Sequence, residues 1–347
     1  MNSKKLFIIL VTLVMILMMS ACERNDEDNA DNFKSVTFKV AVQEAQGQPV
    51  ADMAERIKAR IEEQSEGKIN LDMFFAGQLG SYEAVYEEVQ MGTIDIAIQS
   101  IPTQFDDRYN ITCLPYSTTN TEQWKTLWLP NGAGYEKLSS YFEDNGIKLL
   151  STIDYGFMAL GFSNIKNGID NVMDPKQKKD FLIRVPAMET YIKLSQEMGF
   201  NTTAIPYGDL YSALQTGVAD GVIGCSTMPL WDSFRDVLKA VVDARYVCET
   251  GGCIINANKF NNLPIEYQDI ILKVFTDESS SHADNMNSLE KDYLKKLSDY
   301  GVKVVYPSQE ELNTMATHIQ ENVWPMYADL VGKNELDMLL NKIAEME

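Results

Sequence analysis

The sequence predicts an α/β fold of two lobes that close on each other as a clamshell, joined by hinge strands and by one long helix. Segments in which apolar and polar residues alternate are followed by segments with apolar residues three and four positions apart, the patterns of strands and helices. Strands that alternate with helices form a mainly parallel sheet covered by helices. The chain has 347 residues, more than one ordinary core accommodates, which favours two lobes.

The elements of the first lobe are delimited by turn and cap residues. Pro49 opens the first helix and Gly67 follows its end, while Ser81 is placed to cap a second helix that Gly92 stops. The turn at 77–80 lies between a strand and that second helix, so its backbone amides can face an anion. The expected elements are strands at 36–42, 69–75 and 94–98, and helices at 49–61 and 82–91.

The same alternation returns in the second half of the chain. The expected elements are extended segments at 147–151 and 153–162, strands at 182–185, 222–223, 241–247 and 253–256, helices at 188–198 and 228–240, and a helical turn at 211–215. A chain that builds one lobe, crosses to a second and returns predicts crossings near residues 155 and 248. The first lobe then comprises residues 33–154 plus 249–290, and the second comprises 155–248 plus 291–347.

One helix is expected to lie across both lobes. Residues 264–300 contain no internal glycine or proline, and an unbroken helix of this length spans roughly 55 Å. A break at the polar run 277–281 is the alternative.

The N-terminus has the features of a secretory signal. Lys4 and Lys5 precede an apolar stretch at 6–19, which is shorter than the ~20 residues of a membrane span. Residues 19–22 (Met-Ser-Ala-Cys) resemble a bacterial lipobox, so residues 1–21 are expected to be a lipoprotein signal peptide and Cys22 to be lipidated. An ordinary signal peptide or an uncleaved anchor is the alternative. The acidic residues 22–32 bury almost no apolar surface and predict a solvated tether.

Charge and cysteine content exclude several functions. The net charge of −20 repels nucleic acid and anionic lipid headgroups, so no nucleic-acid partner is expected. Neither histidine, His282 or His318, is spaced from a cysteine as zinc sites require, so no metal or other cofactor is expected. An exported chain could pair its remaining cysteines in three ways, and 248 and 253 could bridge facing strands. These cysteines are Cys113, Cys225, Cys248 and Cys253.

Several segments, in order and at matching spacing, resemble the solute-binding proteins of tripartite ATP-independent periplasmic (TRAP) transporters. The first-lobe pieces are 68–80 and 89–95, the second-lobe pieces are 183–186 (Ile-Arg-Val-Pro) and 210–221, and the C-terminal part runs from 256 to 304. The resemblance implies a two-lobe fold like that of periplasmic binding proteins, a small organic acid as ligand and a membrane permease as partner. An extracytoplasmic monomer is expected, and the lipobox-like residues 19–22 predict that it is lipid-anchored to the membrane.

Arg184 is the leading candidate for contact with the ligand. It interrupts an apolar strand, and a buried arginine needs an anionic partner. The planar guanidinium fits a carboxylate with two parallel hydrogen bonds. From the residues alone, an ion pair with one of the many acids is the alternative; the resemblance implies that Arg184 clamps the ligand carboxylate. Further candidate lining residues, placed by the resemblance and by strand ends, are Tyr207, Gln43, Gln99, Ser100, Tyr155, Asn256 and Tyr82.

Two positions depart from the family pattern. Many relatives carry a second arginine where this chain has Met158, and an asparagine where this chain has Gly224. Loss of a cation and an amide favours a ligand whose body is apolar. We therefore expect a monocarboxylate with an apolar or aromatic body, and a dicarboxylate or sugar acid is the alternative.

The function expected is ligand capture for an importer, without chemistry. A lipoprotein of the same fold that presents its ligand to a membrane sensor kinase is one alternative. An extracytoplasmic hydrolase is the other, and it lacks support because Ser212 and Ser226 have no nearby histidine and no Gly-x-Ser-x-Gly occurs. No catalytic residue is expected.

Overall fold

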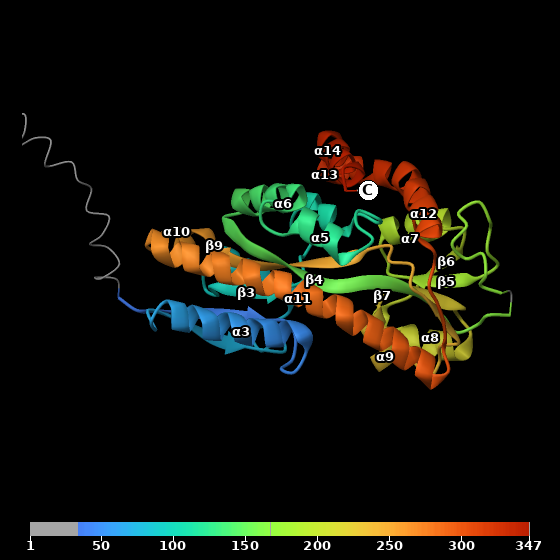
Figure 1. The fold of residues 1–347 in the computed structure, drawn as a ribbon, viewed down its shortest axis with the longest axis horizontal. Helices are drawn as coiled ribbons and strands as arrows, with labels where there is room; N and C mark the ends of the chain where they lie inside the picture. Colours follow the sequence, from blue (N-terminus) through green and yellow to red (C-terminus); the bar gives the residue numbers. More distant parts are fainter. Residues whose placement is uncertain (1–33, 167, 347) are drawn as a thin grey trace, which may run out of the picture.

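The computed structural model describes residues 34–166 and 168–346, in which helices flank a single mixed sheet (Figure 1). The expected signal peptide, Cys22 and the tether lie outside the described residues. The strands are β1 (Val36–Val42), β2 (Ile69–Phe74), β3 (Ile96–Gln99), β4 (Ile147–Phe162), β5 (Leu182–Val185), β6 (Asn201–Ala204), β7 (Gly221–Ser226), β8 (Ala240–Val242), β9 (Cys248–Asn256) and β10 (Lys303–Val305).

The helices include three short 3₁₀ segments, η1 to η3. In chain order they are α3 (Pro49–Gln64), α4 (Tyr82–Met91), η1 (Asp107–Cys113), α5 (Thr121–Trp128), α6 (Ala133–Asp144), α7 (Glu189–Glu197), η2 (Tyr207–Asp209), α8 (Leu210–Thr216), α9 (Thr227–Asp232), α10 (Ala257–Asn261), α11 (Ile265–Tyr300), α12 (Gln309–Asn322), η3 (Trp324–Tyr327), α13 (Ala328–Val331) and α14 (Lys333–Ala344). In the described part of the chain, none of them has the length and apolar character that a bilayer crossing demands.

The sheet has two parallel ends joined by antiparallel strands. Its order is β2-β1-β3-β9-β4-β7-β5-β6, with β8 pairing to β4 and β10. Strands β1, β2 and β3 are parallel, as are β5, β6 and β7, while β9 and β4 run antiparallel to each other between the two groups. This arrangement confirms the α/β class and the separation into two halves connected by strands.

Two long strands carry the chain between the halves. Strand β4 is continuous over 16 residues, where the sequence predicted two segments, and its pairing with β9 shifts register between Asp154 and Phe157. Gly156 lies at this irregularity with φ +96°, a left-handed conformation that glycine adopts without strain. The crossing near residue 155 therefore coincides with a β-bulge.

Helix α11 confirms the expectation of one long helix, because it runs without a break for 36 residues. Its first half packs against α3, where Glu278 pairs with Arg56 and Arg60 at 2.8 Å each. Its second half contacts α9 and the underside of β4, so it lies alongside both halves (Figure 1). The polar run 277–281 does not interrupt the helix, since Glu278 and Ser279 are buried in this packing.

The local signals around α4 act as expected. The Ser81 hydroxyl accepts a hydrogen bond from the Ala84 amide at the start of the helix. Gly92 ends the helix in the left-handed conformation, at φ +79°. Capping residues thus fix the position of Tyr82, the first residue of α4 and one of the candidate lining residues.

Three expectations for the second half and the cysteines are wrong. Helix α9 ends at Asp232 instead of 240, and the strand predicted at 241–247 is replaced by β8, which stops at Val242. The backbone of β8 pairs with both β4 and β10, and this tertiary pairing overrides local helix propensity. Cys248 and Cys253 do not bridge facing strands, because both lie on β9. Five strand residues separate them by ~16 Å, beyond disulfide reach.

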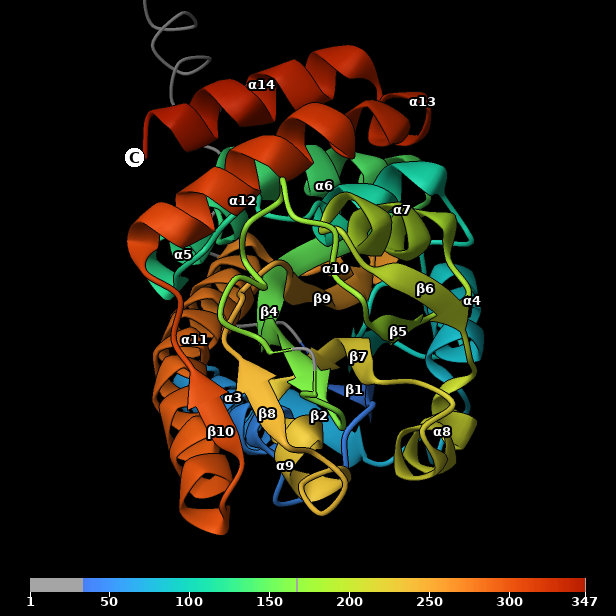
Figure 2. The ribbon, with the colours of Figure 1, turned by 90° about the vertical axis from the view of Figure 1, so that its right-hand side faces the viewer.

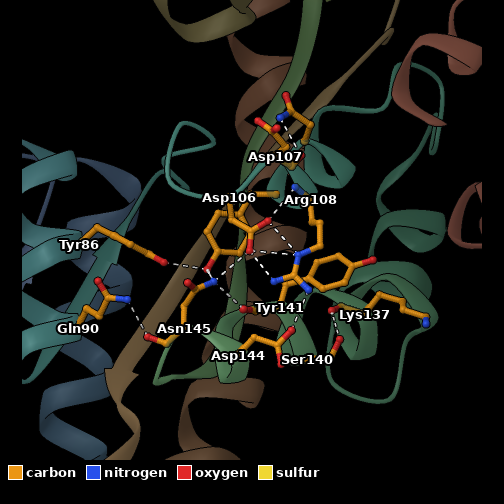
Figure 3. A network of polar contacts seen from close by, with 12 residues as sticks. Tyr86, Gln90, Asp106, Asp107, Arg108, Lys137, Ser140, Tyr141, Asp144 and Asn145 are labelled. Atoms are coloured by element: carbon orange, nitrogen blue, oxygen red, sulfur yellow. Dashed lines mark hydrogen bonds and ion pairs between the residues drawn. The ribbon is translucent and has the colours of Figure 1, made fainter. Parts of the chain in front are cut away.

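The helices within residues 107–144 and 309–344 were not predicted from the sequence. Viewed toward the second half, α12, α13 and α14 form a layer over one side of the sheet (Figure 2). Helix α12 contacts α7 in the second half, whereas α13 contacts η1 and α14 contacts α6 in the first. In η1, Arg108 pairs with Asp106 at 2.6 Å and with Asp144 at 2.8 Å, and it stacks on Tyr141 (Figure 3). This network fastens η1 to α6.

Candidate ligand-binding site

The first half presents a pocket of about 320 Å³ at the carboxyl ends of β1 and β3. Three of the predicted residues, Gln43, Gln99 and Tyr82, line it together with the 77–80 turn. The Gln99 amide donates to the Tyr82 carbonyl at 2.9 Å, and the Ser100 backbone amide donates to Gln43 Oε1 at 2.8 Å. These hydrogen bonds hold the strand-end side chains in fixed orientations.

Two carboxyl groups lie beside these residues. The Ser100 hydroxyl donates to Glu249 Oε1 at 3.3 Å, and the Tyr155 hydroxyl donates to Glu44 Oε2, also at 3.3 Å. Burial raises the pKa of Glu249, and it raises that of Glu44 to about 7, with the nearby Glu249 adding to the effect. Ser100 and Tyr155 therefore hydrogen-bond to acids that the sequence did not single out.

Arg184, on β5, is the charged residue of the candidate site in the second half of the molecule. It is 3% exposed, its Nε donates to the Ile205 carbonyl at 2.8 Å, and its Nη1 donates to the Ile223 carbonyl at 3.5 Å. Among residues 34–166 and 168–346, no acid forms an ion pair with it. Burial lowers the pKa of its guanidinium, yet arginine stays charged in proteins. Backbone carbonyls thus orient the guanidinium of Arg184, and no carboxylate among the described residues neutralises its charge.

The other predicted residues of the second half surround Arg184 with mostly apolar or neutral groups. A side-chain carbon at Gly224 would stand 3.8 Å from Arg184 Nη1, and the Gly224 amide donates to the Tyr246 hydroxyl at 2.7 Å. Met158 is buried and its sulfur accepts a hydrogen bond from the Tyr191 hydroxyl at 3.3 Å. Tyr207 is 53% exposed and packs edge-on against Phe234. Gly224 thus lies directly beside the guanidinium of Arg184, with Pro186 as its other neighbour.

Asn256 is the one predicted lining residue that the structure does not bring to these groups. Its side chain caps α10 and donates to the carbonyls of Val89 and Gln90 at 3.0 and 3.2 Å. It lies six residues beyond Thr250 along β9, ~20 Å from the crossing. Asn256 therefore ties β9 to the end of α4.

Shared neighbours relate the two groups of residues to each other. Tyr191 and Cys225 each lie close enough to both Arg184 and Glu249 for the two charges to influence them. Burial, reinforced by Glu249 and opposed by Arg184, raises the pKa of Cys225 to about 12. A hydrogen bond also links the two strands, because the amide of Gly224, which lies beside Arg184 Nη1, donates to the hydroxyl of Tyr246, three residues before Glu249.

Sequence reasoning missed Glu249, Glu44, Tyr191 and Tyr246. One signal for Glu249 was present, since it is a charged residue between Cys248 and Thr250 at the predicted crossing, as Arg184 is within its apolar strand. The tyrosines reach the site through tertiary packing that no local pattern marks.

The candidate site contains groups that can bind a ligand, and the histidines of the described residues lie elsewhere. His282 contacts the Asp154 carbonyl at 2.9 Å under β4, and His318 contacts Glu197 at 3.1 Å on α12, so both imidazoles are engaged elsewhere. Within the described ranges, no three histidine, cysteine or acidic side chains gather as a metal site would require. A buried arginine, amide donors and tyrosines suit reversible binding of a carboxylate.

Comparison with known proteins defines the class. The profile of the bacterial extracellular solute-binding proteins, family 7, matches residues 40–329, so the chain belongs to this family of substrate-binding transport proteins. It is similar to a solved TRAP periplasmic solute-binding protein from Ochrobactrum anthropi, with a TM-score of 0.81, 20% identity, and coverage of 91% of this chain and 97% of that one. The two-lobe fold and the TRAP resemblance are thereby confirmed.

Two curated relatives bind named acids. The sialic acid-binding periplasmic protein SiaP of Vibrio cholerae is 21% identical over 317 residues, which is 90% of this chain and 93% of SiaP. A monocarboxylate 2-oxoacid-binding periplasmic protein of Nostoc sp. is 25% identical over 265 residues, which is 74% of this chain and 70% of that protein. Proteins of this class bind small organic ligands and work with membrane permeases.

Proposed function

We propose that this protein captures a monocarboxylate with an apolar or aromatic body and delivers it to a TRAP permease, without catalysing a reaction. The observation that carries the proposal is Arg184, a cation that is 3% exposed and bonded only to backbone carbonyls. A buried charge without a counter-ion is costly, and a ligand carboxylate would supply the missing partner. The curated relatives named above, which bind acids, support the ligand class.

The surroundings of Arg184 favour an apolar ligand body. Met158 occupies the place where many relatives carry a second arginine, and its sulfur is already engaged by Tyr191. The exposed ring of Tyr207 offers an apolar face in the same half. A second carboxylate would find no arginine at this position, so we expect one carboxylate contact, with Arg184, to dominate recognition of the ligand's anionic group.

The test is a thermal-shift screen of an organic-acid library, followed by calorimetric titration of the strongest ligand. Truncating one partner of a buried, hydrogen-bonded charge pair costs about 2–5 kcal/mol, so Arg184→Ala should weaken binding by roughly 30- to 5,000-fold. Arg184→Lys should recover only part of the loss, because the planar fork is absent. A folded Arg184→Ala protein that binds within threefold of wild type would contradict the proposal.

Closure of the two halves around the ligand is part of the same proposal. Ligand should favour a closed state by binding it more tightly, with movement at the bulge in β4 and at the neighbouring part of β9. Small-angle scattering should then give a smaller radius of gyration at saturating ligand. An unchanged radius in a sample shown to bind would exclude closure.

We also propose that Cys22 anchors the mature protein to the outer face of the membrane through attached lipid. The support is the lipobox-like run at 19–22 after the apolar stretch. Cys22→Ser should release the protein from the membrane fraction, and retention of the variant as in wild type would refute the anchor.

A further inference from the structure

The half of the site that faces Arg184 contains acids that the proposed function does not use. Glu249 lies on β9 directly after the crossing, and its described contact is the Ser100 hydroxyl at 3.3 Å. Glu44 lies after β1, and its side chain accepts from the Tyr155 hydroxyl. In the part of the chain that the structure describes, neither carboxyl group forms an ion pair with a lysine, arginine or histidine.

Three of the four most buried acids in the described part of the chain form ion pairs, and the fourth, Asp154, accepts hydrogen bonds from the Gly156 amide and the Cys248 thiol. Glu278 pairs with Arg56 and Arg60, and Glu290 contacts Arg245 at 3.3 Å. Asp95 pairs with Lys259. This is the usual requirement for acids removed from water, because an unpaired buried charge is costly. Glu249 and Glu44, which are partly buried, are a further exception, because each accepts a hydrogen bond from a hydroxyl and forms no ion pair among the described residues.

The exception is matched by Arg184 on the opposite side. Arg184 is a buried cation without an acid, and Glu249 is an acid without a cation, and both influence the same two side chains, Tyr191 and Cys225. They do not form a pair with each other. The Ile205 carbonyl holds Arg184, while Ser100 holds Glu249 on a different strand. The two groups are nevertheless connected, since Gly224 lies beside Arg184 Nη1 and its amide donates to Tyr246, three residues before Glu249 on the chain.

We propose that the ligand is a zwitterion, whose carboxylate binds Arg184 and whose ammonium or other cationic nitrogen group binds Glu249, with Glu44 as the supporting acid. The inference rests on the proposed function, because it uses the same site and the same contact with Arg184. A molecule with both charges satisfies the two unpaired groups at once, whereas a simple carboxylate satisfies only Arg184.

The protonation of the two acids fits this assignment. Burial raises the pKa of both Glu249 and Glu44, as expected for carboxyl groups that lack a cation in the unliganded protein. A ligand cation within hydrogen-bond distance would lower these pKa values and release protons on binding.

The experiment uses three pairs of compounds that differ in the amine: L-phenylalanine and 3-phenylpropanoate, L-proline and cyclopentanecarboxylate, and 6-aminohexanoate and hexanoate. Affinities for the full mature protein are measured by calorimetry in wild type, Glu249→Gln and a control, Glu278→Gln, which removes an equal charge far from the site. In wild type, at least one zwitterion should bind about tenfold or more tightly than its amine-free partner. Glu249→Gln should abolish that preference and Glu278→Gln should preserve it.

Three results would overturn the inference: tighter binding of the amine-free acids by wild type, a preference that survives Glu249→Gln, or no binding of any zwitterion. Arg184→Ala separates failure of this inference from failure of the proposed function. If Arg184→Ala removes binding of an amine-free acid that wild type prefers, the carboxylate contact stands and the zwitterion falls. If carboxylates bind equally well to Arg184→Ala, the proposed function falls as well.

Discussion

Two arginines in the second half of the molecule, the buried Arg184 and the partly buried Arg245, have opposite surroundings. Arg245 contacts Glu290 at 3.3 Å and Asp243 at 3.6 Å, donates to the Thr119 carbonyl at 2.6 Å, and lies 3.9 Å from the centre of the Phe157 ring. Arg184 has only the carbonyls of Ile205 and Ile223. The charge of Arg245 is therefore neutralised by neighbouring acids, whereas no acid among the described residues neutralises the charge of Arg184.

The difference separates a structural cation, Arg245, from Arg184, the cation that we propose binds the ligand. Arg245 connects the loop before β9 to α11, where its acid partners keep it in place whether or not ligand is present. The charge of Arg108 in the first half is neutralised in the same way, by Asp106 and Asp144 (Figure 3). Only Arg184 of these three retains a charge for an outside anion, and we expect its energetic contribution to appear on binding and not on folding.

The largest expected effect is on stability, from Arg245→Ala. Removing this cation leaves the buried Glu290 without its partner, which typically costs about 3–5 kcal/mol in the free energy of unfolding. Arg184→Ala should change the unfolding free energy of the unliganded protein by about 1 kcal/mol or less, since no acid loses a partner. Urea denaturation of both variants measures the contrast. Equal losses of unfolding free energy in Arg245→Ala and Arg184→Ala would show that the two arginines do not differ in this way.

A second, smaller effect concerns Glu290 and pH. Burial, opposed by Arg245 and reinforced by Asp154 and Asp243, raises its pKa from 4.5 to about 7. The folded protein therefore binds more protons than the unfolded chain between pH 4.5 and 7, so this group's contribution to stability falls as pH rises through that window. Glu290→Gln removes the titration, and the variant should gain up to about 3 kcal/mol relative to wild type between pH 5 and pH 8.

Comparison of wild type with Glu290→Gln isolates this carboxyl from its neighbours. His282 and Asp154 also titrate, with pKa values of about 4 and about 6, but they are present in both proteins. Unfolding midpoints measured at pH 5, 6, 7 and 8 give the difference directly. A difference that stays constant with pH would show that Glu290 is ionised throughout.

The smallest effect tests how closely the geometry around Arg184 is set. Gly224 has φ +96°, and a side-chain carbon there would meet Pro186 at 3.1 Å and Arg184 Nη1 at 3.8 Å. Gly224→Ala should cost about 1–3 kcal/mol through backbone strain, and it should also weaken ligand binding because Pro186, two residues after Arg184, must give way to the new side chain. Gly217→Ala is the matched control, because φ is +76° there and nothing lies within 4 Å. If both variants lose stability but neither loses affinity, the position of Arg184 tolerates change.

Local signals in the sequence were sufficient for much of the fold. Ser81 and Gly92 delimit α4 through their own backbone contacts, and the absence of glycine and proline predicts α11 correctly. Residues 233–240 and 243–247 were misassigned because the limits of β8 depend on pairing with β4 and with β10, more than 60 positions away. Helix propensity alone carries no information about such partners.

The residues of the candidate site likewise divide into those with a local sequence signal and those without one. Arg184 was identifiable because a charged residue within an apolar strand needs an explanation that its neighbours do not provide. Glu290, which contacts the Phe157 amide 133 positions away, gave no local signal, and neither did the tyrosines around Arg184. Long-range electrostatic partners become visible only when the strands that carry them are assembled.

The unbroken helix α11 restricts how the halves can move. If only β4 and β9 joined them, the halves could both bend and twist about the crossing with little resistance. Helix α11 is held to α3 through Glu278 in one half and contacts α9 in the other, and Glu290 binds it to the bulge between them. Twisting would shear these contacts in opposite directions, whereas bending in the plane of the helix strains them least. We therefore expect closure to have a single degree of freedom.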